Sequence, residues 1–346
     1  MNAHPVFCTI VPPHILDKLA RADDPALAEP ARRTLRADSA HRTRRLTATL
    51  AAPGTPRDTP RRTVYDARHR TTLPGHKVRG EGDDAGKDAT VNRAYAGLGA
   101  TFELYLKAFG RHSIDDNGLP LDASVHYDEK YNNAFWDGTQ MVFGDGDGEI
   151  FLDFTIPVDV IGHELTHGVT QYTANLTYSG QSGALNESVS DVFGSLIKQY
   201  ALGQTADQAD WLIGAGLLAS GVSGVALRSM KAPGTAYDDD VLGKDPQPAT
   251  MSGYVTTDDD NGGVHLNSGI PNHAFYLLAR ELGGKAWERA GHVWYDTLTG
   301  GDLPAEASFS DFARLTVAAA TARFGGGAEQ EAVVKAWSQV GVPTGA

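Results

Sequence analysis

Two histidines and a glutamate in the stretch 158–168 carry the clearest chemical signal in this sequence. His163 and His167 are four residues apart, so on a helix both imidazoles lie on one face and can point at a single metal ion. Glu164 follows the first histidine and can reach a water at that metal without binding the metal itself. The spacing therefore predicts a metal site with a general base beside it. The alternative is an ordinary amphipathic helix with two partly buried histidines.

A metal site that does chemistry needs three protein ligands and an open position. Glu187 lies on the apolar face of a helical pattern over 183–194, where an unpaired carboxylate would be costly to bury. Asp191 follows one turn later on the same side and can hydrogen-bond to a liganding histidine. We predict Glu187 as the third ligand and Asp191 as that partner. An exposed acidic helix face is the alternative for both residues.

The elements that must position these residues change in type along the chain. Strand patterns occur at 63–67, 123–127 and 141–143, and an amphipathic helix is expected over 88–109. From residue 158 onward the expected elements are helices, at 158–173, 183–202, 207–219, 269–282, 284–299, 309–324 and 328–340. A β-rich N-terminal half and an α-rich C-terminal half predict an α+β fold of two lobes with a cleft between them.

The first 50 residues look like a separate small unit, followed by a Pro-rich, basic stretch at 51–62 that is typical of an exposed linker. We therefore predict three parts: a leader with its linker at 1–55, a β-rich lobe at 56–157 and a helical lobe at 158–346. Residues 1–75 hold 13 Lys and Arg against 7 Asp and Glu, whereas the whole chain has a net charge of −13. A basic leader on an acidic body favours intramolecular docking. The rival interpretation, a nucleic-acid-binding arm, lacks interleaved aromatics and a recognisable binding fold.

The composition is that of a soluble globular protein. The 346 residues are 41% hydrophobic and 21% charged, and no run of apolar residues is long enough to span a membrane. The first thirteen residues lack the basic and apolar regions of a secretory signal peptide, so none is expected. A single cysteine, Cys8, excludes an internal disulfide framework and a cysteine-based zinc finger.

Four stretches together resemble the thermolysin family of zinc endopeptidases, in that family's order and spacing. They are His163-Glu164-Leu165-Thr166-His167, Gly183-Ala184-Leu185-Asn186-Glu187, Asn132-Asn133-Ala134-Phe135-Trp136 and Gly262-Gly263-Val264-His265-Leu266-Asn267-Ser268-Gly269. The resemblance covers roughly residue 63 to the end. The leader, with Pro12-Pro13-His14-Ile15-Leu16, is similar to the short propeptide of the protealysin subgroup. The resemblance implies a two-lobed thermolysin-like fold with zinc in the cleft.

The resemblance also implies a role for each residue of the metal motif. His163, His167 and Glu187 would hold one Zn²⁺, with water as the fourth ligand. Asp191 would orient His163. Glu164 would take a proton from that water as it attacks the peptide carbonyl, and then deliver the proton to the leaving nitrogen.

Two further side chains would stabilise the oxyanion of the tetrahedral intermediate. By resemblance these are Tyr178 and His265, with Asp260 holding and charging His265. An aspartate five residues before a histidine in a glycine-rich turn can fold back on it. Without the family context, Tyr178 would be a half-buried aromatic and His265 a loop histidine.

The resemblance places the substrate along an edge strand. Asn133 and the backbone of Ala134 would bind its main chain, and Arg228 would hydrogen-bond to one of its carbonyls. An apolar pocket after the scissile bond would favour Leu, Phe, Ile or Val. Its lining would be Phe151, Phe154, Val160, Ile213 and Leu227. The alternatives are a surface salt bridge for Arg228 and core positions for the two phenylalanines.

The sequence departs from the larger family members at their double calcium site. Asp159 and Asp210 match ligands there, but Lys198, Leu212 and Ala215 stand where acidic residues are expected. These replacements argue against structural Ca²⁺. Lys198 is a candidate for a built-in cation that replaces part of the calcium charge.

The leader gives Cys8 a possible function, because a thiolate is a good zinc ligand. Our hypothesis is a zymogen in which the leader lies across the cleft as an intramolecular inhibitor, with Cys8 near the metal. The alternative is that Cys8 is a small apolar core residue of the leader. Removal of roughly residues 1–55 would release the enzyme.

The leading interpretation is thus a zinc endopeptidase that acts on proteins or peptides. A catalytically silent zinc or peptide-binding module is the rival, against which Glu164, Tyr178 and His265 argue. We expect a monomer without nucleic-acid or membrane partners. Family resemblance favours secretion, and cytoplasmic action is the alternative because no signal peptide is visible.

Overall fold

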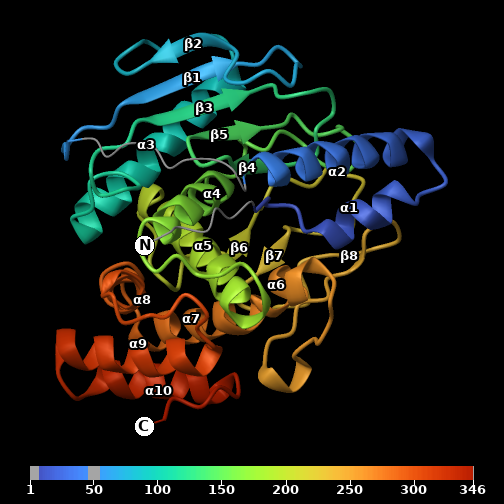
Figure 1. The fold of residues 1–346 in the computed structure, drawn as a ribbon. Helices are drawn as coiled ribbons and strands as arrows, with labels where there is room; N and C mark the ends of the chain where they lie inside the picture. Colours follow the sequence, from blue (N-terminus) through green and yellow to red (C-terminus); the bar gives the residue numbers. More distant parts are fainter. Residues whose placement is uncertain (1–7, 46–54, 346) are drawn as a thin grey trace.

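The computed structural model describes residues 8–45 and 55–345. It contains a mixed sheet, two central helices beneath it and a group of C-terminal helices below these (Figure 1). The predicted α+β class, with a sheet in the N-terminal half and helices in the C-terminal half, is confirmed. Among the helices of the described residues, none combines the length and apolarity needed to cross a lipid bilayer.

Five strands form the sheet in the order β2-β1-β3-β5-β4. They are β1 (Arg62–Asp66), β2 (His76–Gly80), β3 (Leu121–Val125), β4 (Ala134–Trp136) and β5 (Gln140–Phe143). The pairs β1–β3 and β3–β5 are parallel, whereas β1–β2 and β4–β5 are antiparallel. β4 therefore lies at one edge, where a strand offers backbone groups to a further extended segment.

Helix α3 (Ala89–Phe109) connects the sheet to the central helices. Asp88 caps its start by accepting hydrogen bonds from Thr90 N and Val91 N, and Gly110 ends it in a left-handed conformation. Its apolar face packs against β1 and α4. The helix predicted from the amphipathic pattern is therefore present, and it packs between the sheet and α4.

The central pair is α4 (Val158–Gln171) and α5 (Gly180–Ala201), which pack closely along one another. All residues of α4 from Asp159 onward are buried. The pair can approach closely because Gly194 has no side chain: a Cβ there would lie only 2.5 Å from the carbonyl oxygen of Asp159. This contact sets the distance at which side chains from the two helices meet.

The C-terminal region consists of helices and two short hairpins. The helices are α6 (Asp260–Asn267), α7 (Gly269–Leu282), α8 (Ala290–Thr299), α9 (Phe309–Phe324) and α10 (Ala328–Gln339), with a 3-10 turn at Met251–Gly253. The hairpins pair β6 (Leu212–Ile213) with β7 (Arg228–Ser229) and β8 (Asp238–Asp239) with β9 (Gly243–Lys244). Stacked Trp294 and Trp337, with Phe312 against both, form an aromatic core for this region.

The prediction of a helix over 207–219 is wrong. Trp211, Gly214 and Gly216 have φ angles of 59°, 77° and 85°, and a right-handed helix cannot pass through such residues. The apolar side chains that suggested a helix are buried from an irregular segment instead, with Trp211 and Ile213 in the core. Periodicity alone did not distinguish the two structures, because both bury the same residues.

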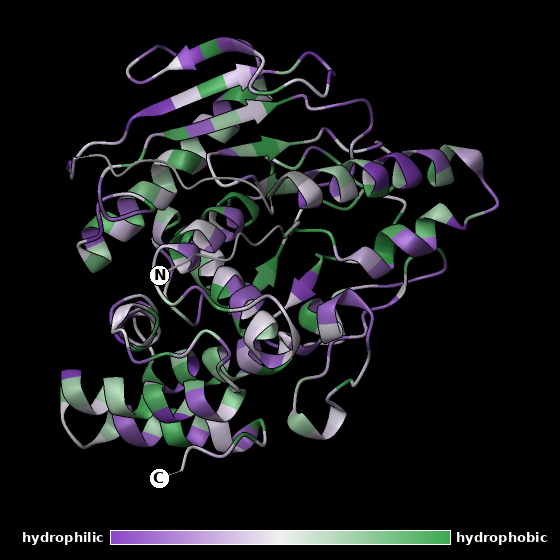
Figure 2. Ribbon diagram, viewed as in Figure 1, coloured by the Kyte–Doolittle hydropathy of each residue, from purple (hydrophilic) through white to green (hydrophobic). Residues whose placement is uncertain are grey.

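The described part of the leader forms two helices, α1 (Pro13–Ala20) and α2 (Pro25–Arg45), which pack on each other. α2 extends from the region of β4 toward the right of the view (Figure 1). Hydrophilic residues recur along α2, whereas β5 is largely hydrophobic (Figure 2). Thr34 on α2 accepts a hydrogen bond at 3.0 Å from the backbone N–H of Asn132, just before β4. The leader therefore lies against the edge of the sheet.

Candidate active site

Helix α4 brings His163 and His167 to one face, as their spacing predicts. Their rings pack edge to face, with centroids 4.7 Å apart, and their Nε2 atoms are separated by 3.1 Å. Both side chains are buried. Two ring nitrogens thus converge on one point of the cleft wall.

Each histidine is fixed through its other ring nitrogen. His163 Nδ1 lies 2.8 Å from Oδ1 of Asp191, and His167 Nδ1 lies 2.8 Å from Oδ1 of Asn186. Such outer partners set the ring orientation and leave Nε2 available as a metal ligand. Burial lowers the pKa of His167 to about 4, which favours the neutral ring that a metal needs.

Glu187 on α5 completes the group. Its Oε2 is 3.6 Å from His163 Nε2, and its Oε1 is 3.6 Å from His167 Nε2. Burial alone would raise the pKa of Glu187, but His265 and the two α4 histidines lower it to about 2. Within the described residues Oε2 has no hydrogen-bond donor, which a cation would remedy. Two imidazoles and one carboxylate, with their atoms within 4.8 Å of one another, fit Zn²⁺.

Glu164 lies beside this group without joining it. Its Oε2 accepts a hydrogen bond at 3.2 Å from the backbone N–H of Trp136 on β4. Its Oε1 has no hydrogen-bond partner among the described residues. Burial, followed by the charge of Glu187, raises the pKa of Glu164 well above its ordinary value. One oxygen is therefore held by the edge strand, and the other is available to a water or a substrate.

Tyr178 and His265 approach the site from the opposite side. The Tyr178 hydroxyl hydrogen-bonds to Oε1 of Glu187 and lies 3.4 Å from His265 Nε2. His265 Nδ1 lies 2.7 Å from Oδ1 of Asp260. Burial opposes the charge of His265, but Asp260 and Glu187 raise its pKa to about 9. The structure thus brings two potential donors together, and the raised pKa of His265 favours its charged form.

The start of α6 explains how Asp260 reaches His265. Asn261, Gly262 and Gly263 have φ angles of 53°, 86° and 73°, so the chain turns sharply before the regular helix begins. The Asp260 carboxylate then also accepts the backbone N–H of His265 at 2.9 Å. The two glycines of this motif allow the backbone to adopt the positive φ angles that the turn requires.

Three groups expected to bind a substrate main chain line one side of the site. Asn133 Oδ1 and the Ala134 carbonyl both accept hydrogen bonds from the leader. Arg228 is buried and donates to Asp191 through Nε and Nη2, both at 2.8 Å. Its Nη1 donates at 3.1 Å to the carbonyl of Ile10. The alternative of a surface salt bridge for Arg228 is therefore wrong.

The five residues expected to line an apolar pocket are all buried in the main hydrophobic cluster. These are Phe151, Phe154, Val160, Ile213 and Leu227. Ile10 of the leader is fully buried in the same cluster.

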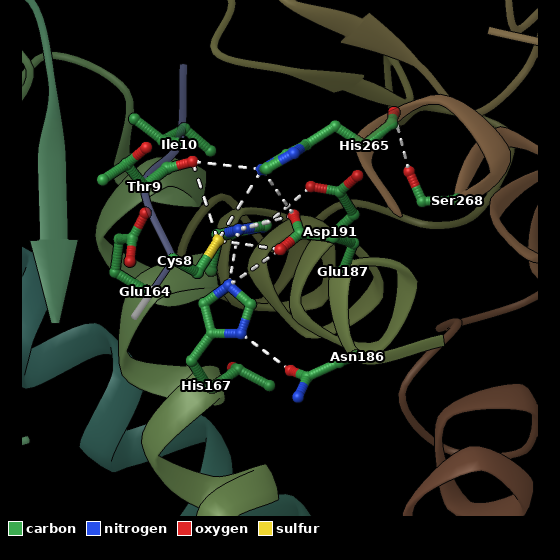
Figure 3. A network of polar contacts seen from close by, with 12 residues as sticks. Cys8, Thr9, Ile10, Glu164, His167, Asn186, Glu187, Asp191, His265 and Ser268 are labelled. Atoms are coloured by element: carbon green, nitrogen blue, oxygen red, sulfur yellow. Dashed lines mark hydrogen bonds and ion pairs between the residues drawn. The ribbon is translucent and has the colours of Figure 1, made fainter. Parts of the chain in front are cut away.

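Cys8 lies at the centre of the site (Figure 3). Its Sγ is 2.7 Å from Oε1 of Glu187, 2.9 Å from the Tyr178 hydroxyl and 3.7 Å from His265 Nε2. It belongs to the same group of potential metal ligands as His163, His167 and Glu187. The thiol is thus close to the place where a metal would bind.

Comparison with known proteins agrees with this geometry. Residues 42–171 match the family described as thermolysin metallopeptidase, catalytic domain, and residues 174–342 match thermolysin metallopeptidase, alpha-helical domain. The chain belongs to the thermolysin family. It is therefore a metalloendopeptidase, a hydrolase of a family that uses catalytic zinc, and it presents a candidate site for that ion.

Individual relatives of the thermolysin family resemble the chain over different lengths. An extracellular metalloprotease of Pectobacterium carotovorum subsp. carotovorum is 51% identical over 99% of this chain and 98% of its own length. The solved precursor of protealysin, a metalloproteinase from Serratia proteamaculans, is 53% identical, with a TM-score of 0.89 over 97% of this chain and 99% of its own. A thermolysin of Alicyclobacillus acidocaldarius subsp. acidocaldarius is 40% identical over 81% of this chain but only 50% of its own length. The thermolysin-like fold is thus confirmed.

Lys198 lies among the groups that match calcium ligands in larger thermolysins. Its Nζ is 2.7 Å from Asp159 Oδ2, 2.9 Å from Asp210 Oδ1 and 2.8 Å from the carbonyl of Leu212. A protein cation thus neutralises the buried Asp159. This contact supports the interpretation of Lys198 as a built-in cation.

Sequence reasoning missed Asn186 and Asn272, which complete the hydrogen bonds around the metal group. Asn272 donates to Asp191 Oδ2 at 2.8 Å. Asn186 precedes Glu187 directly, so its place in that motif was a usable signal. Asn272 lies on another helix, and only the fold brings it to the site.

Replacing Asn186 with alanine is expected to weaken zinc binding by about 10–100-fold, because His167 loses the partner that fixes its ring. Competition with a fluorescent chelator measures this affinity directly. The control is Asn175→Ala, a nearby asparagine outside the metal group. An Asn186→Ala protein with unchanged zinc affinity would show that the orientation of His167 does not depend on this contact.

Proposed function

We propose that this chain hydrolyses peptide bonds by activating a water between Glu164 and a zinc ion held by His163, His167 and Glu187. The observation that carries this proposal is the buried Glu164, whose Oε1 has no hydrogen-bond partner among the described residues, beside two histidines and a carboxylate that converge on one point. When bound, zinc acts as a Lewis acid that polarises a carbonyl and makes water more acidic.

Other residues of the chain would bind the substrate and transfer the proton. The substrate would extend along β4, with its main chain held by Asn133 and Ala134 and one carbonyl bound by Arg228. Glu164 would take the proton from the attacking water and deliver it to the leaving nitrogen.

Tyr178 and His265 would donate hydrogen bonds to the oxyanion that forms on the substrate. The ion pair with Asp260 supports a charged His265 for this role. Neither side chain has to transfer its proton to the substrate. Each donates a hydrogen bond that stabilises the negative charge developing on the carbonyl oxygen.

The apolar cluster around Ile213 and Leu227 supports a preference for a bulky apolar residue after the scissile bond. The experiment compares two peptides that differ only there, with Leu or Asp. We expect kcat/KM to be at least about 100-fold higher for Leu, because a carboxylate would be buried unpaired. Equal rates would refute this specificity, and absence of cleavage of any peptide would refute the proposed activity.

We further propose that the chain is a zymogen, with residues 1–55 as propeptide and linker and residues 56–157 and 158–346 as catalytic lobes. Contacts between leader and lobe support this. Arg33 forms a salt bridge with Asp128, and His41 lies 2.7 Å from the Tyr127 hydroxyl. The similar protein from Serratia proteamaculans is named a precursor. Residues 46–54, which include the start of the predicted linker at 51–62, lie outside the described residues.

The relative from Pectobacterium carotovorum is named extracellular, which supports secretion as the proposed location. Cytoplasmic action remains the alternative that follows from the sequence. Detection of the leader-free chain in culture medium, with a cytoplasmic marker absent from that medium, would distinguish them.

Leader docking is expected to weaken as the pH rises from about 4 to about 7. Asp38 on α2 is buried, with donors from the Tyr131 hydroxyl at 2.5 Å and Asn133 Nδ2 at 3.1 Å and with Arg42 nearby. Burial raises its pKa to about 7, whereas an undocked leader would carry an ordinary aspartate with a pKa near 4. Below both values the group is neutral in both states and has no effect. Between them, docking retains a proton that the free leader releases, so each pH unit weakens docking by up to about tenfold.

The measurement is the rate at which an added protease removes the leader between pH 5 and pH 8, corrected for the pH dependence of that protease. The Asp38→Asn chain should lose most of the pH dependence. If it retained the wild-type profile, another group would control docking.

A further inference from the structure

The leader crosses the candidate active site as an extended segment whose backbone contacts are specific. Ile10 N donates at 3.2 Å to the carbonyl of Ala134, and the Ile10 carbonyl accepts from Arg228 at 3.1 Å. Val11 N donates at 3.0 Å to Asn133 Oδ1. These are the groups to which the proposed function assigns the substrate main chain. The leader therefore binds as a substrate would.

The same contacts fix which peptide bond lies at the reacting position. Ile10 is fully buried and belongs to the main hydrophobic cluster, which also contains the five residues assigned to the pocket after the scissile bond. The carbonyl oxygen before it, that of Thr9, is 3.3 Å from His265 Nε2, one of the two oxyanion donors. Figure 3 shows the Thr9 carbonyl directed toward His265. The bond between Thr9 and Ile10 thus lies in the register and direction of a bond to be cleaved.

The thiol of Cys8 lies beside this bond, in the group of potential metal ligands. Cys8 Sγ contacts Glu187 and Tyr178, and it lies within the group of potential metal ligands. It therefore fills the space in which an attacking water would have to sit, and it engages an oxyanion donor.

We propose that the Thr9–Ile10 bond is a latent substrate of the chain's own active site, cleaved once the Cys8 thiol leaves the metal group. This inference rests on the proposed function. Water would add to the Thr9 carbonyl carbon, and the carbon–nitrogen bond would break. Glu164 would carry one proton from water to the Ile10 nitrogen. The products are residues 1–9 with a new carboxylate and a chain that begins at Ile10 with a new amine.

This cleavage would make activation irreversible before the linker is cut. Residues 1–9 include the thiol, whereas α1 and α2 remain attached to the chain after Ile10. The clipped leader would therefore keep its helical contacts but could no longer return Cys8 to the site. Once the segment that carries the Cys8 thiol has been cut off, the leader could no longer inhibit the site.

The test uses the full-length Cys8→Ala chain, produced without metal and then given zinc, with products identified by intact mass. We expect a fragment of residues 1–9 and a chain beginning at Ile10, formed at a rate that does not change on tenfold dilution because the reaction is intramolecular. The matched Cys8→Ala/Glu164→Ala chain should remain intact at this bond. The wild-type chain should be cut there at least about 100-fold more slowly, because its thiol excludes the water.

The inference is overturned if the Cys8→Ala chain cleaves the leucine-containing peptide of the specificity experiment while its Thr9–Ile10 bond stays intact. Failure to cleave that peptide, with the leader removed and zinc bound, would instead contradict the proposed function. The two failures are therefore distinguishable.

A second measurement does not depend on turnover. In the metal-free chain with Cys8 intact, alkylation of the thiol reports opening of the leader. Ile10→Asp should accelerate alkylation by about 100-fold because a charge enters the apolar pocket, whereas Ile10→Val should change it by less than about tenfold. Equal rates for Ile10→Asp and wild type would show that Ile10 does not anchor the leader, and would overturn the register.

Discussion

Replacing Glu164 with alanine is expected to lower kcat/KM for peptide hydrolysis by about 10²–10⁴-fold, because the chain loses the group that we assign to carry the proton from water to the leaving nitrogen. The side chain is fully buried and does not belong to the group of potential metal ligands. Zinc content, measured by atomic absorption, should therefore remain at one ion per chain. Loss of activity with zinc still bound would show that Glu164 acts as a general base and not as a zinc ligand.

Glu164→Gln provides the matched control, since it keeps the volume and can still accept the hydrogen bond from Trp136 N. We expect it to be as inactive as Glu164→Ala and as well folded as the wild type. Activity within a few fold of the wild type in either variant would exclude Glu164 as the base. Loss of zinc in both would instead point to a ligand role.

The second large effect concerns stability. Replacing Lys198 with methionine is expected to destabilise the fold by about 3–5 kcal/mol, because the buried Asp159 carboxylate loses its neutralising partner. Urea unfolding of the inactive Glu164→Ala chain measures this without self-digestion. The Asp210→Asn variant is the control: Asp210 is 45% exposed, so its loss should cost no more than about 1 kcal/mol.

Urea unfolding also tests whether the chain needs calcium for its stability. If Lys198 replaces the calcium charge, a calcium chelator should leave the unfolding midpoint of the Lys198-containing chain unchanged. A Lys198→Met chain as stable as the wild type would mean that the ion pair does not stabilise this region. A midpoint that falls when calcium is removed would mean that Lys198 does not replace the calcium charge.

The sequence predicted the parts of the site that depend on local spacing. His163 and His167 meet because a helix repeats every 3.6 residues, and the apolar face around Glu187 required a second buried helix. The contact of Asp260 with His265 was implied by the family resemblance, and the glycine-rich turn between them is compatible with it. Each of these relations lies within one element, so the chain itself determines it.

Relations between distant segments could not be derived in this way. Asn272 reaches Asp191 across 81 positions, and one of the partners of Asp38 on the leader is Asn133, 95 positions away. The resemblance supplied roles for Asn133 and Arg228, but not the register in which the leader meets them. The helix prediction for 207–219 failed for a local reason. Residues in the left-handed conformation interrupt a helix there, but they do not change the spacing of the apolar residues from which the helix was predicted.

The central claim is that a zinc endopeptidase site lies beneath its own leader. One assay tests it: cleavage of a quenched fluorescent peptide with Leu after the scissile bond, by the full chain before and after leader removal, with zinc stripped by a chelator and then restored. The account predicts little activity before removal and high activity after it. That activity should disappear with the chelator and return with Zn²⁺. Equal activity with and without the leader, or activity that survives the removal of zinc, would contradict the account.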